Sequence, residues 1–257
     1  MTETIHRSAA GGYSARAETY RDARPGYPPE LVDRFVERYR GGSTIELGAG
    51  TGIFTRALAE RGVAVMAVEP VAEMRHELEQ HVPGVQVLDG TAERIPVGDA
   101  EAATVLAAQA FHWFDHAVAL DEIARVLVPG GHLVTAWNVR DLSVPWVAAV
   151  TEIIERHAGD TPRHVSMVWR RAIEGDARFE LADDWHCDHP VATDADGVVA
   201  RTLSTSFIGA LDGGEQARVV ADVRAVVEPL GDRFDYPYRA ELQAWRFVGP
   251  EATGAGT

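Results

Sequence analysis

The segment Glu46-Leu47-Gly48-Ala49-Gly50-Thr51-Gly52 constrains the fold more than any other part of the sequence. Residues 44–47 form a short run that predicts a β-strand, and residues 54–61 have the spacing of a helix that Gly62 ends. A glycine-rich turn between a strand and a helix lets a ligand lie close to the backbone. The segment therefore predicts an α/β fold with a ligand above this turn.

Strand-like and helix-like segments alternate after the turn. The sequence predicts strands at 63–68, 85–88, 103–108 and 132–137, with helices at 72–81 and 120–127. Such alternation implies a parallel sheet with helices on both faces. The flanking segments predict further helices at 14–21, 30–39, 145–157, 163–174, 196–211 and 214–227, and strand-like segments at 185–191 and 236–248.

The charge and the cysteine count exclude several classes of protein. The chain has 39 acidic and 24 basic side chains, a formal net charge of −15, and no basic stripe, which argues against nucleic-acid binding. Cys187 is the single cysteine, so neither an intramolecular disulfide nor a cysteine-based zinc cluster can form. Residues 1–8 lack the apolar core of a signal peptide, and no apolar run is long enough to span a bilayer. We therefore expect a cytoplasmic protein that binds neither nucleic acid nor membrane.

Two acidic residues narrow the choice of ligand. A dinucleotide fingerprint needs a third glycine where this sequence has Ile53, which disfavours an NAD(P)-binding turn. Glu46 lies in a buried strand, where a carboxylate is costly unless a positively charged partner is present. Glu69 ends the second strand, the place from which an acidic residue binds ribose in nucleoside-binding α/β folds. Together they indicate a nucleoside ligand that carries positive charge.

The order of the motifs resembles the class I S-adenosylmethionine-dependent methyltransferases. It comprises Glu-x-Gly-x-Gly-x-Gly at 46–52, Val-Glu-Pro at 68–70 and Gly-Thr-Ala-Glu-x-Ile-Pro at 90–96. Arg-Pro-x-Tyr-Pro at 24–28 and Phe-His-Trp-Phe-Asp at 111–115 are similar to a methyltransferase type 11-like, small-molecule branch that contains the trans-aconitate and related carboxylate methyltransferases. The likeness covers residues 13–248.

This resemblance implies both a fold and an activity. The fold is a Rossmann-like, doubly wound sheet of seven strands, the last antiparallel, with helical cap insertions. The activity is methyl transfer (EC 2.1.1.-) from S-adenosylmethionine to a small-molecule acceptor, either a carboxylate or an O, N or S atom of a secondary metabolite. We expect one methyltransferase domain, 1–257, with lid helices at 13–40, a cofactor-binding core at 43–138, and cap helices and final strands at 139–248.

The resemblance also implies which residues bind the cofactor. The glycine loop lies under the methionine part with Glu46 facing its amino group, and Glu69 binds both ribose hydroxyls. Thr91 replaces the Asp that usually meets the adenine, so Thr91 or Glu93 must supply the side-chain contact. The full predicted set is Tyr20, Arg24, Glu46, Gly48, Ala49, Gly50, Gly52, Glu69, Pro70, Met74, Thr91, Ala92, Glu93, Gln109 and Ala110.

The aromatic segment 111–116 follows the fourth strand, on the ligand-binding edge of a parallel sheet. His112 titrates near neutral pH and is the candidate general base, or it shapes the cavity for an acceptor that needs no base. His112 and His116 have no third spaced ligand, so no metal is expected. The predicted acceptor-binding residues are Tyr27, Phe111, His112, Trp113, Trp137 and Asn138, and further lining candidates are Arg140, Trp146, Trp169 and Arg170.

Three other functions compete with this interpretation. An NAD(P)-dependent oxidoreductase with a Rossmann core is disfavoured by Ile53. A methyltransferase of macromolecules is disfavoured by the acidic charge and the cap-like helices. A non-catalytic S-adenosylmethionine-binding protein stays open, as do the monomer and the homodimer.

Overall fold

The computed structural model describes residues 23–249. The expected helix at 14–21, the first part of the expected lid and Tyr20 lie outside the described residues. By their contacts, the described residues form two compact units. Unit 1 comprises residues 23–26, Asn138–Thr161 and Asp188–Arg239, and unit 2 comprises Tyr27–Trp137, Pro162–Cys187 and residues 240–249. The single domain over 1–257 therefore stays a prediction.

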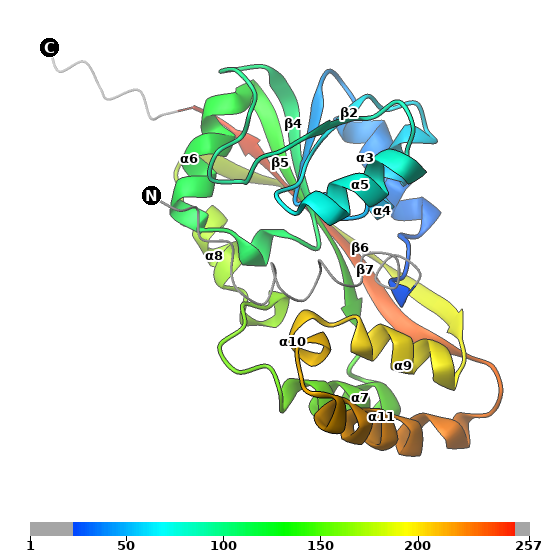
Figure 1. The fold of residues 1–257 in the computed structure, drawn as a ribbon. Helices are drawn as coiled ribbons and strands as arrows, with labels where there is room; N and C mark the ends of the chain where they lie inside the picture. The colour runs from blue at the N-terminus through cyan, green and yellow to red at the C-terminus, as the bar shows by residue number, and fades with distance from the viewer. Residues whose placement is uncertain (1–22, 250–257) are drawn as a thin grey trace, which may run out of the picture. The chain divides into compact units, whose positions relative to one another are not determined.

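Seven strands form one sheet in the order β3-β2-β1-β4-β5-β7-β6 (Figure 1). β1 pairs in parallel with β2 and β4, β2 with β3, and β4 with β5. β7 is antiparallel. The predicted Rossmann-like α/β sheet of seven strands is confirmed. The bounds are β1 Thr44–Leu47, β2 Val65–Val68, β3 Gln86–Leu88, β4 Ala102–Ala108, β5 Leu127–Arg140, β6 Phe179–Thr193 and β7 Phe234–Phe247.

The helices of unit 2 flank the parallel strands (Figure 1). Phe35 of α3 and Phe54 of α4 are fully buried, with ring centroids 5.9 Å apart. Burying each such side chain stabilises the fold by roughly 1.5–3 kcal/mol, which explains why the apolar stripe of α3 packs here. The bounds are α3 Pro29–Tyr39, α4 Ile53–Ala59, α5 Ala72–His81, α6 His116–Val126 and α8 Val168–Glu174, with 3-10 turns η1 Phe111–Trp113 and η2 His164–Ser166.

An ion pair fixes α3 to β6 within unit 2. Arg34 donates through Nε and NH2 to the Asp183 carboxylate at 2.9 and 2.6 Å. The hydroxyl of Tyr39 donates to the same carboxylate at 3.2 Å. These bonds lower the pKa of Asp183 even though its burial opposes them. Asp183 therefore holds the helix that precedes β1 and the glycine loop.

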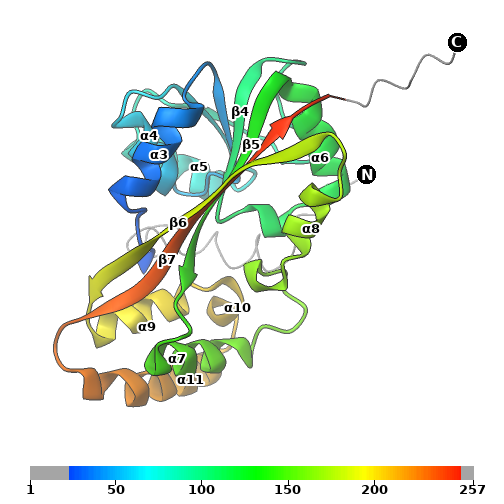
Figure 2. The same cartoon turned by 180° about the vertical axis from the view of Figure 1, so that it is seen from behind.

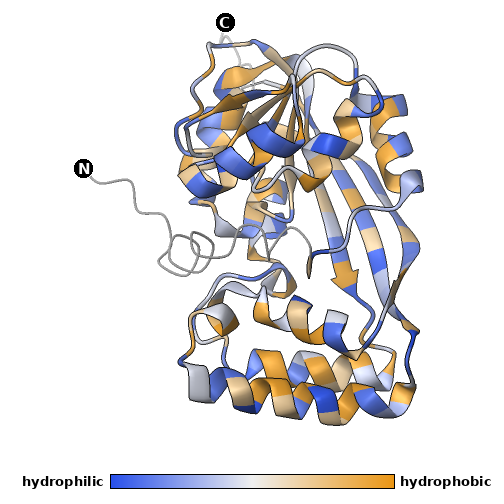
Figure 3. Ribbon diagram, turned by 45° about the vertical axis from the view of Figure 1, so that its right-hand side comes forward, coloured by the Kyte–Doolittle hydropathy of each residue, from blue (hydrophilic) through white to orange (hydrophobic). Residues whose placement is uncertain are grey.

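Unit 1 has its own apolar core. Val147 and Val150 of α7, Val219 and Val223 of α11 and Tyr236 of β7 are buried together. Figure 2 shows α11 beside α7, and Figure 3 shows the hydrophobic and hydrophilic stripes of these helices. The bounds are α7 Pro145–Glu155, α9 Ala195–Leu203, α10 Ser206–Gly209 and α11 Gly213–Val227, with the 3-10 turn η3 Glu228–Leu230.

The structure corrects two predicted helices and one helix start. The helix at 163–174 is broken at Met167, whose φ of 54° is left-handed and ends regular hydrogen bonding. The helix at 196–211 is broken after α9, where the Ser204 hydroxyl donates to the Arg201 carbonyl at 2.7 Å and competes with helical bonding. The helix at 120–127 starts earlier because Asp115 caps it by accepting from Val118 N.

Candidate functional site

The glycine loop joins β1 to α4 in unit 2. Gly48, Gly50 and Gly52 have φ values of 65, 57 and 79°, a region that disfavours side chains. Gly48 N and Ala49 N donate to Val68 O at 2.9 and 3.3 Å, which fixes the loop against the end of β2. A Cβ at Gly50 would meet no atom of residues 23–249 within 4 Å, so none of the described residues fills the space above this glycine. The loop thus presents the partly exposed backbone of Gly48 and Gly50 at the carboxyl ends of two parallel strands.

Glu69 ends β2 and lies beside this loop. The residue is 6% exposed, and its two carboxylate oxygens accept from Gly50 N and Val71 N, each at 2.9 Å. Arg75 donates to the backbone carbonyl of Glu69 at 2.8 Å. Burial nevertheless raises the pKa of Glu69, and the two backbone bonds oppose that rise. A carboxylate offers about four lone-pair sites, so sites remain for hydroxyl donors.

Glu46 is the second buried carboxyl group of the loop. It is 1% exposed and accepts from the Thr55 hydroxyl at 2.6 Å. Burial raises its pKa to about 8; the bond from Thr55 lowers it, and the nearby Glu69 raises it further. No ion pair to Glu46 occurs among residues 23–249. The described residues supply no cation shared by these two neighbouring buried carboxyl groups, so a positive charge brought to them would favour their ionised forms.

The segment after β3 supplies a polar group of a different kind. Thr91 and Arg94 form a short antiparallel bridge. Glu93 Oε1 accepts from Asp115 N at 2.8 Å, so this carboxylate is held at the start of α6. The Thr91 hydroxyl is buried and has no hydrogen-bond partner within the described chain. Of the two side chains predicted to meet the adenine, Thr91 is therefore the one with a free donor and acceptor.

Gln109 and Ala110 follow β4. Gln109 has a φ of 56°, unusual for a residue other than glycine, and its N–H donates to Ala136 O at 2.9 Å. Such strain persists where the surrounding structure enforces it, and it is concentrated at functional sites. Ala110 lies so close to the glycine loop that a Cβ at Gly48 would stand 2.8 Å from its own Cβ. The predicted neighbours Gly48 and Ala110 are thus together in the structure.

The aromatic segment 111–116 lies in unit 2 and is buried at Phe111 and partly exposed at most of its other residues. Phe111 is fully buried and stacks on the His116 ring at 5.7 Å. Burial lowers the pKa of His116. The His112 ring lies 5.0 Å from Trp113 and 5.6 Å from Trp137. His112 is therefore part of an aromatic cluster, an arrangement that suits cavity shaping as well as proton transfer.

The remaining predicted residues divide between the two units. Tyr27 packs edge-on against Phe54 at 4.6 Å, and Trp137 is fully buried, both in unit 2. In unit 1, Arg24 donates to Ser204 O at 3.1 Å, and Asn138 donates to Gly26 O at 2.9 Å. The roles predicted for these four residues at the cofactor or the acceptor stay predictions.

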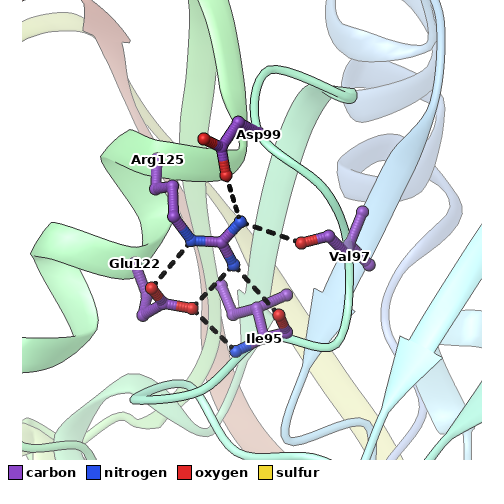
Figure 4. A network of polar contacts seen from close by, with 5 residues as sticks. All are labelled: Ile95, Val97, Asp99, Glu122 and Arg125. Carbon is purple, nitrogen blue, oxygen red and sulfur yellow. Dashed lines mark hydrogen bonds and ion pairs between the residues drawn. The ribbon is translucent and has the colours of Figure 1, made fainter.

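A polar network holds the segment that carries Thr91. Arg125 of α6 donates to the carbonyls of Ile95 and Val97 and to the carboxylates of Asp99 and Glu122 (Figure 4). Glu122 in turn accepts from Ile95 N at 3.0 Å. These bonds raise the pKa of Arg125 and lower that of Glu122. The loop between β3 and β4 is thereby tied to α6.

Sequence reasoning missed this network and the partner of Glu46. Thr55 lies on α4, nine positions beyond Glu46, and only the turn at the glycine loop brings the two together. Glu122 and Arg125 are three apart on a predicted helix, a spacing that indicates a pair but not its reach to the loop. Residues 23–249 contain no cluster of three or more His, Cys, Asp or Glu side chains arranged to hold a metal. Within the same range, no helix has the length and apolarity needed to cross a membrane.

The sheet order and the glycine loop are those of the class I S-adenosylmethionine-dependent methyltransferases. Comparison with known proteins identifies the family. The methyltransferase domain family Methyltransf_11 matches residues 45–135. The chain is similar to a methyltransferase-like protein of Schizosaccharomyces pombe, with 36% identity over 82% of this chain and 84% of that protein. The chain belongs to this methyltransferase family. This membership decides against the NAD(P)-dependent oxidoreductase that the sequence analysis considered as an alternative.

The chain is also similar to an uncharacterized methyltransferase of Mycobacterium tuberculosis H37Rv, with 43% identity over 61% of this chain. The match spans 64% of the length of that relative. Two solved structures share the fold, each at 16% identity. The YcgJ protein of Bacillus subtilis has a TM-score of 0.57 over 86% of this chain and 98% of its own. Geranyl diphosphate methyltransferase in complex with S-adenosylmethionine has a TM-score of 0.50 over 95% and 94%.

The family uses S-adenosylmethionine, and the residues of unit 2 fit that molecule. Its ammonium and sulfonium groups are positively charged, which suits the buried carboxyl group of Glu46, for which the described residues supply no cation. Its ribose hydroxyls suit the lone pairs that Glu69 has left, and its adenine suits the buried hydroxyl of Thr91. Among residues 23–249, no atom fills the space above Gly50, which leaves room for a ligand against the backbone.

Proposed function

We propose that this chain transfers a methyl group from S-adenosylmethionine to a small-molecule acceptor. The observation that carries the proposal is the pair of buried carboxyl groups, Glu46 and Glu69, beside a glycine loop with open space above Gly50. A pyrophosphate would bring negative charge to these two carboxyl groups, whereas a sulfonium nucleoside brings positive charge. The pair therefore favours the methyl donor over a dinucleotide.

Twelve of the fifteen predicted cofactor residues have a role in this proposal. Glu69 accepts hydrogen bonds from the ribose hydroxyls, and Glu46 faces the ammonium group. Thr91 and Ala92 meet the adenine, with Pro70 and Met74 beside it. Gly48, Ala49, Gly50 and Gly52 lie under the methionine part, and Gln109 and Ala110 border the sulfur. The open space at Gly50, the free hydroxyl of Thr91 and the closeness of Ala110 to Gly48 support this arrangement.

The chemistry demands alignment more than acid–base work from the protein. When bound, the cofactor supplies a methyl group on positively charged sulfur, which leaves as a neutral thioether. The residues of unit 2 then hold the donor and exclude water around it. A carboxylate acceptor is already nucleophilic, in which case His112 shapes the cavity. A hydroxyl or phenol acceptor must lose a proton, and His112 would then act as the base.

The finer assignment within this proposal concerns the acceptor. The resemblance of residues 24–28 and 111–115 to the trans-aconitate methyltransferase branch supports a carboxylate, and a secondary metabolite is the alternative. A screen with methyl-labelled cofactor against carboxylates, phenols and amines distinguishes the two. Transfer of label to a small molecule also separates an enzyme from a cofactor-binding protein without activity.

The cofactor assignment is tested by calorimetric titration with S-adenosylhomocysteine. We expect Glu69→Ala to weaken binding by roughly 100-fold, because about two hydrogen bonds to a charged group are lost. Glu73→Ala is the matched control, since Glu73 is an exposed residue of the first turn of α5. Unchanged affinity in Glu69→Ala would remove the ribose assignment. Binding of NADH in place of S-adenosylhomocysteine and S-adenosylmethionine would overturn the proposal.

A further inference from the structure

Arg201 is an arginine buried in unit 1. It lies on α9 and is 8% exposed. Its guanidinium carbon stands 5.1 Å from the centre of the Tyr236 ring and 5.5 Å from that of Tyr238. The two tyrosine rings stack on each other at 4.7 Å. The arginine is therefore held by aromatic faces, an arrangement that fixes the position of the charge.

The charge of Arg201 has no carboxylate partner within the described residues. Its Nε donates to Ala23 O at 3.2 Å, and its NH1 donates to the Tyr238 hydroxyl at 3.3 Å. A guanidinium has five N–H groups, so three lack an acceptor in this part of the chain. Arg224 of the same unit differs, because it pairs with both Asp196 and Glu228.

A buried cation without a counter-ion is costly. Burial of an ion costs free energy even after the surroundings relax, and contact with an aromatic face returns only part of that cost. The tyrosines do not act as counter-ions, because burial raises the pKa of Tyr236 to about 12 and keeps it neutral. The Tyr236 side chain hydrogen-bonds Arg140 of β5, so a second cation lies at the same ring. Two arginines thus gather in a chain whose net charge is −15.

We propose that unit 1 contains a binding site for an organic carboxylate, with Arg201 as its main ligand and Arg140 beside it. The planar fork of a guanidinium matches the two oxygens of a carboxylate. The N–H groups of Arg201 that have no acceptor lie on NH1 and NH2, the two nitrogens that form the end of the fork. The carboxylate supplies the counter-ion that the described residues do not.

This site also bears on the acceptor. If the chain is a methyltransferase as proposed above, a carboxylate site within unit 1 favours acidic small molecules over neutral ones as the class of acceptor. That step rests on the proposed function. Binding of a carboxylate to unit 1 does not, because it follows from Arg201 and its surroundings alone.

The test is calorimetric titration of the whole chain with citrate, with glutarate and its neutral counterpart glutaramide, and with inorganic phosphate. We expect citrate and glutarate to bind more tightly than glutaramide and phosphate. Arg201→Gln should weaken citrate binding by at least about tenfold, because this variant loses a charge-assisted hydrogen bond to the ligand. Arg224→Gln removes the same charge from unit 1 at a residue already paired, and its citrate affinity should match that of the original chain.

Two further measurements keep the proposal falsifiable. If Arg201→Gln does not fold, Arg201→Lys retains the charge against the tyrosine rings and loses the fork, and Arg140→Gln removes the second cation. Each variant should weaken citrate binding at least about threefold, because each loses part of the free energy of one charge-assisted hydrogen bond. Absence of carboxylate binding to the original chain, tighter binding of phosphate, or equal citrate affinity in all variants would overturn the proposal. Titration with S-adenosylhomocysteine in the same variants reports separately on the proposed function, because its ligands lie in unit 2.

Discussion

Glu46 illustrates how one buried residue links ligand binding to pH. Its folded-state pKa of about 8 lies above its ordinary value of 4.5, so the folded chain holds this proton more tightly than the unfolded chain. The stability that the protonated group contributes is complete below pH 4.5 and is lost as the pH rises through 8. A positively charged ligand reverses the preference, because it favours the carboxylate.

We therefore expect Glu46→Gln to flatten the pH dependence of stability of the ligand-free protein. The glutamine keeps the shape of the side chain and cannot ionise, so the free energy of unfolding should fall less between pH 5 and pH 8 than in the original chain. Urea unfolding at several pH values measures this difference. Parallel curves for the two proteins would show that Glu46 does not titrate in this range.

Thr91 supports a second prediction at the residue scale. Its hydroxyl is buried without a partner, so Thr91→Val should leave the stability of the free protein unchanged or slightly raised. Affinity for S-adenosylhomocysteine should fall roughly 2–10-fold, the value of one hydrogen bond. Thr44→Val is the control, because the Thr44 hydroxyl is also buried without a partner but lies at the start of β1. Equal losses in both variants would argue against an adenine contact at Thr91.

At the scale of elements, most of the fold was predictable from the sequence. The α5 bounds at 72–81 agree with the structure, because a continuous helical pattern lies between two strand-like runs. The buried strands were predictable because alternation of strands and helices leaves few topologies. The breaks at Met167 and after α9 were not, since a single left-handed residue or one serine bond interrupts a pattern without altering its hydrophobic spacing.

The features of the candidate site also divide into those that the sequence predicts and those that it does not. The positions of the glycines, Glu46 and Glu69 in the fold were predictable, because a strand end and a glycine turn mark them in the sequence, while their roles toward the cofactor stay predictions. The engagement of Glu93 by Asp115 N was not, because it depends on where the loop after β3 meets α6. Contacts between distant segments depend on tertiary packing, which neither spacing nor composition records.

The Arg125 network leads to a prediction for the loop between β3 and β4. Arg125→Met removes the donors that tie Ile95, Val97 and Asp99 to α6. We expect a loss of roughly 1–3 kcal/mol in the free energy of unfolding and faster hydrogen exchange at 91–97. Affinity for S-adenosylhomocysteine should fall as well, because this loop carries Thr91. Arg156→Met, at an exposed pair with Glu152, should change none of these values, and faster exchange there would contradict the assignment.

At the scale of the whole molecule, calorimetry tests whether the two units unfold together. A ligand that binds the folded state at about 100 times its Kd stabilises it by about 2.7 kcal/mol. For a chain of this size that corresponds to a rise of roughly 5–10 °C in Tm. If the predicted single domain is correct, S-adenosylhomocysteine should shift one cooperative transition, with equal calorimetric and van't Hoff enthalpies.

Citrate makes this test sharper, because its proposed ligands lie in unit 1 and those of S-adenosylhomocysteine lie in unit 2. If the chain is one cooperative domain, each ligand should raise the Tm of the same transition, since both ligands bind only the folded chain. Glu69→Ala should abolish the shift with S-adenosylhomocysteine and spare that with citrate, whereas Arg201→Gln should do the reverse. Two transitions, each moved by one ligand alone, would refute the single domain and still assign each site to its unit.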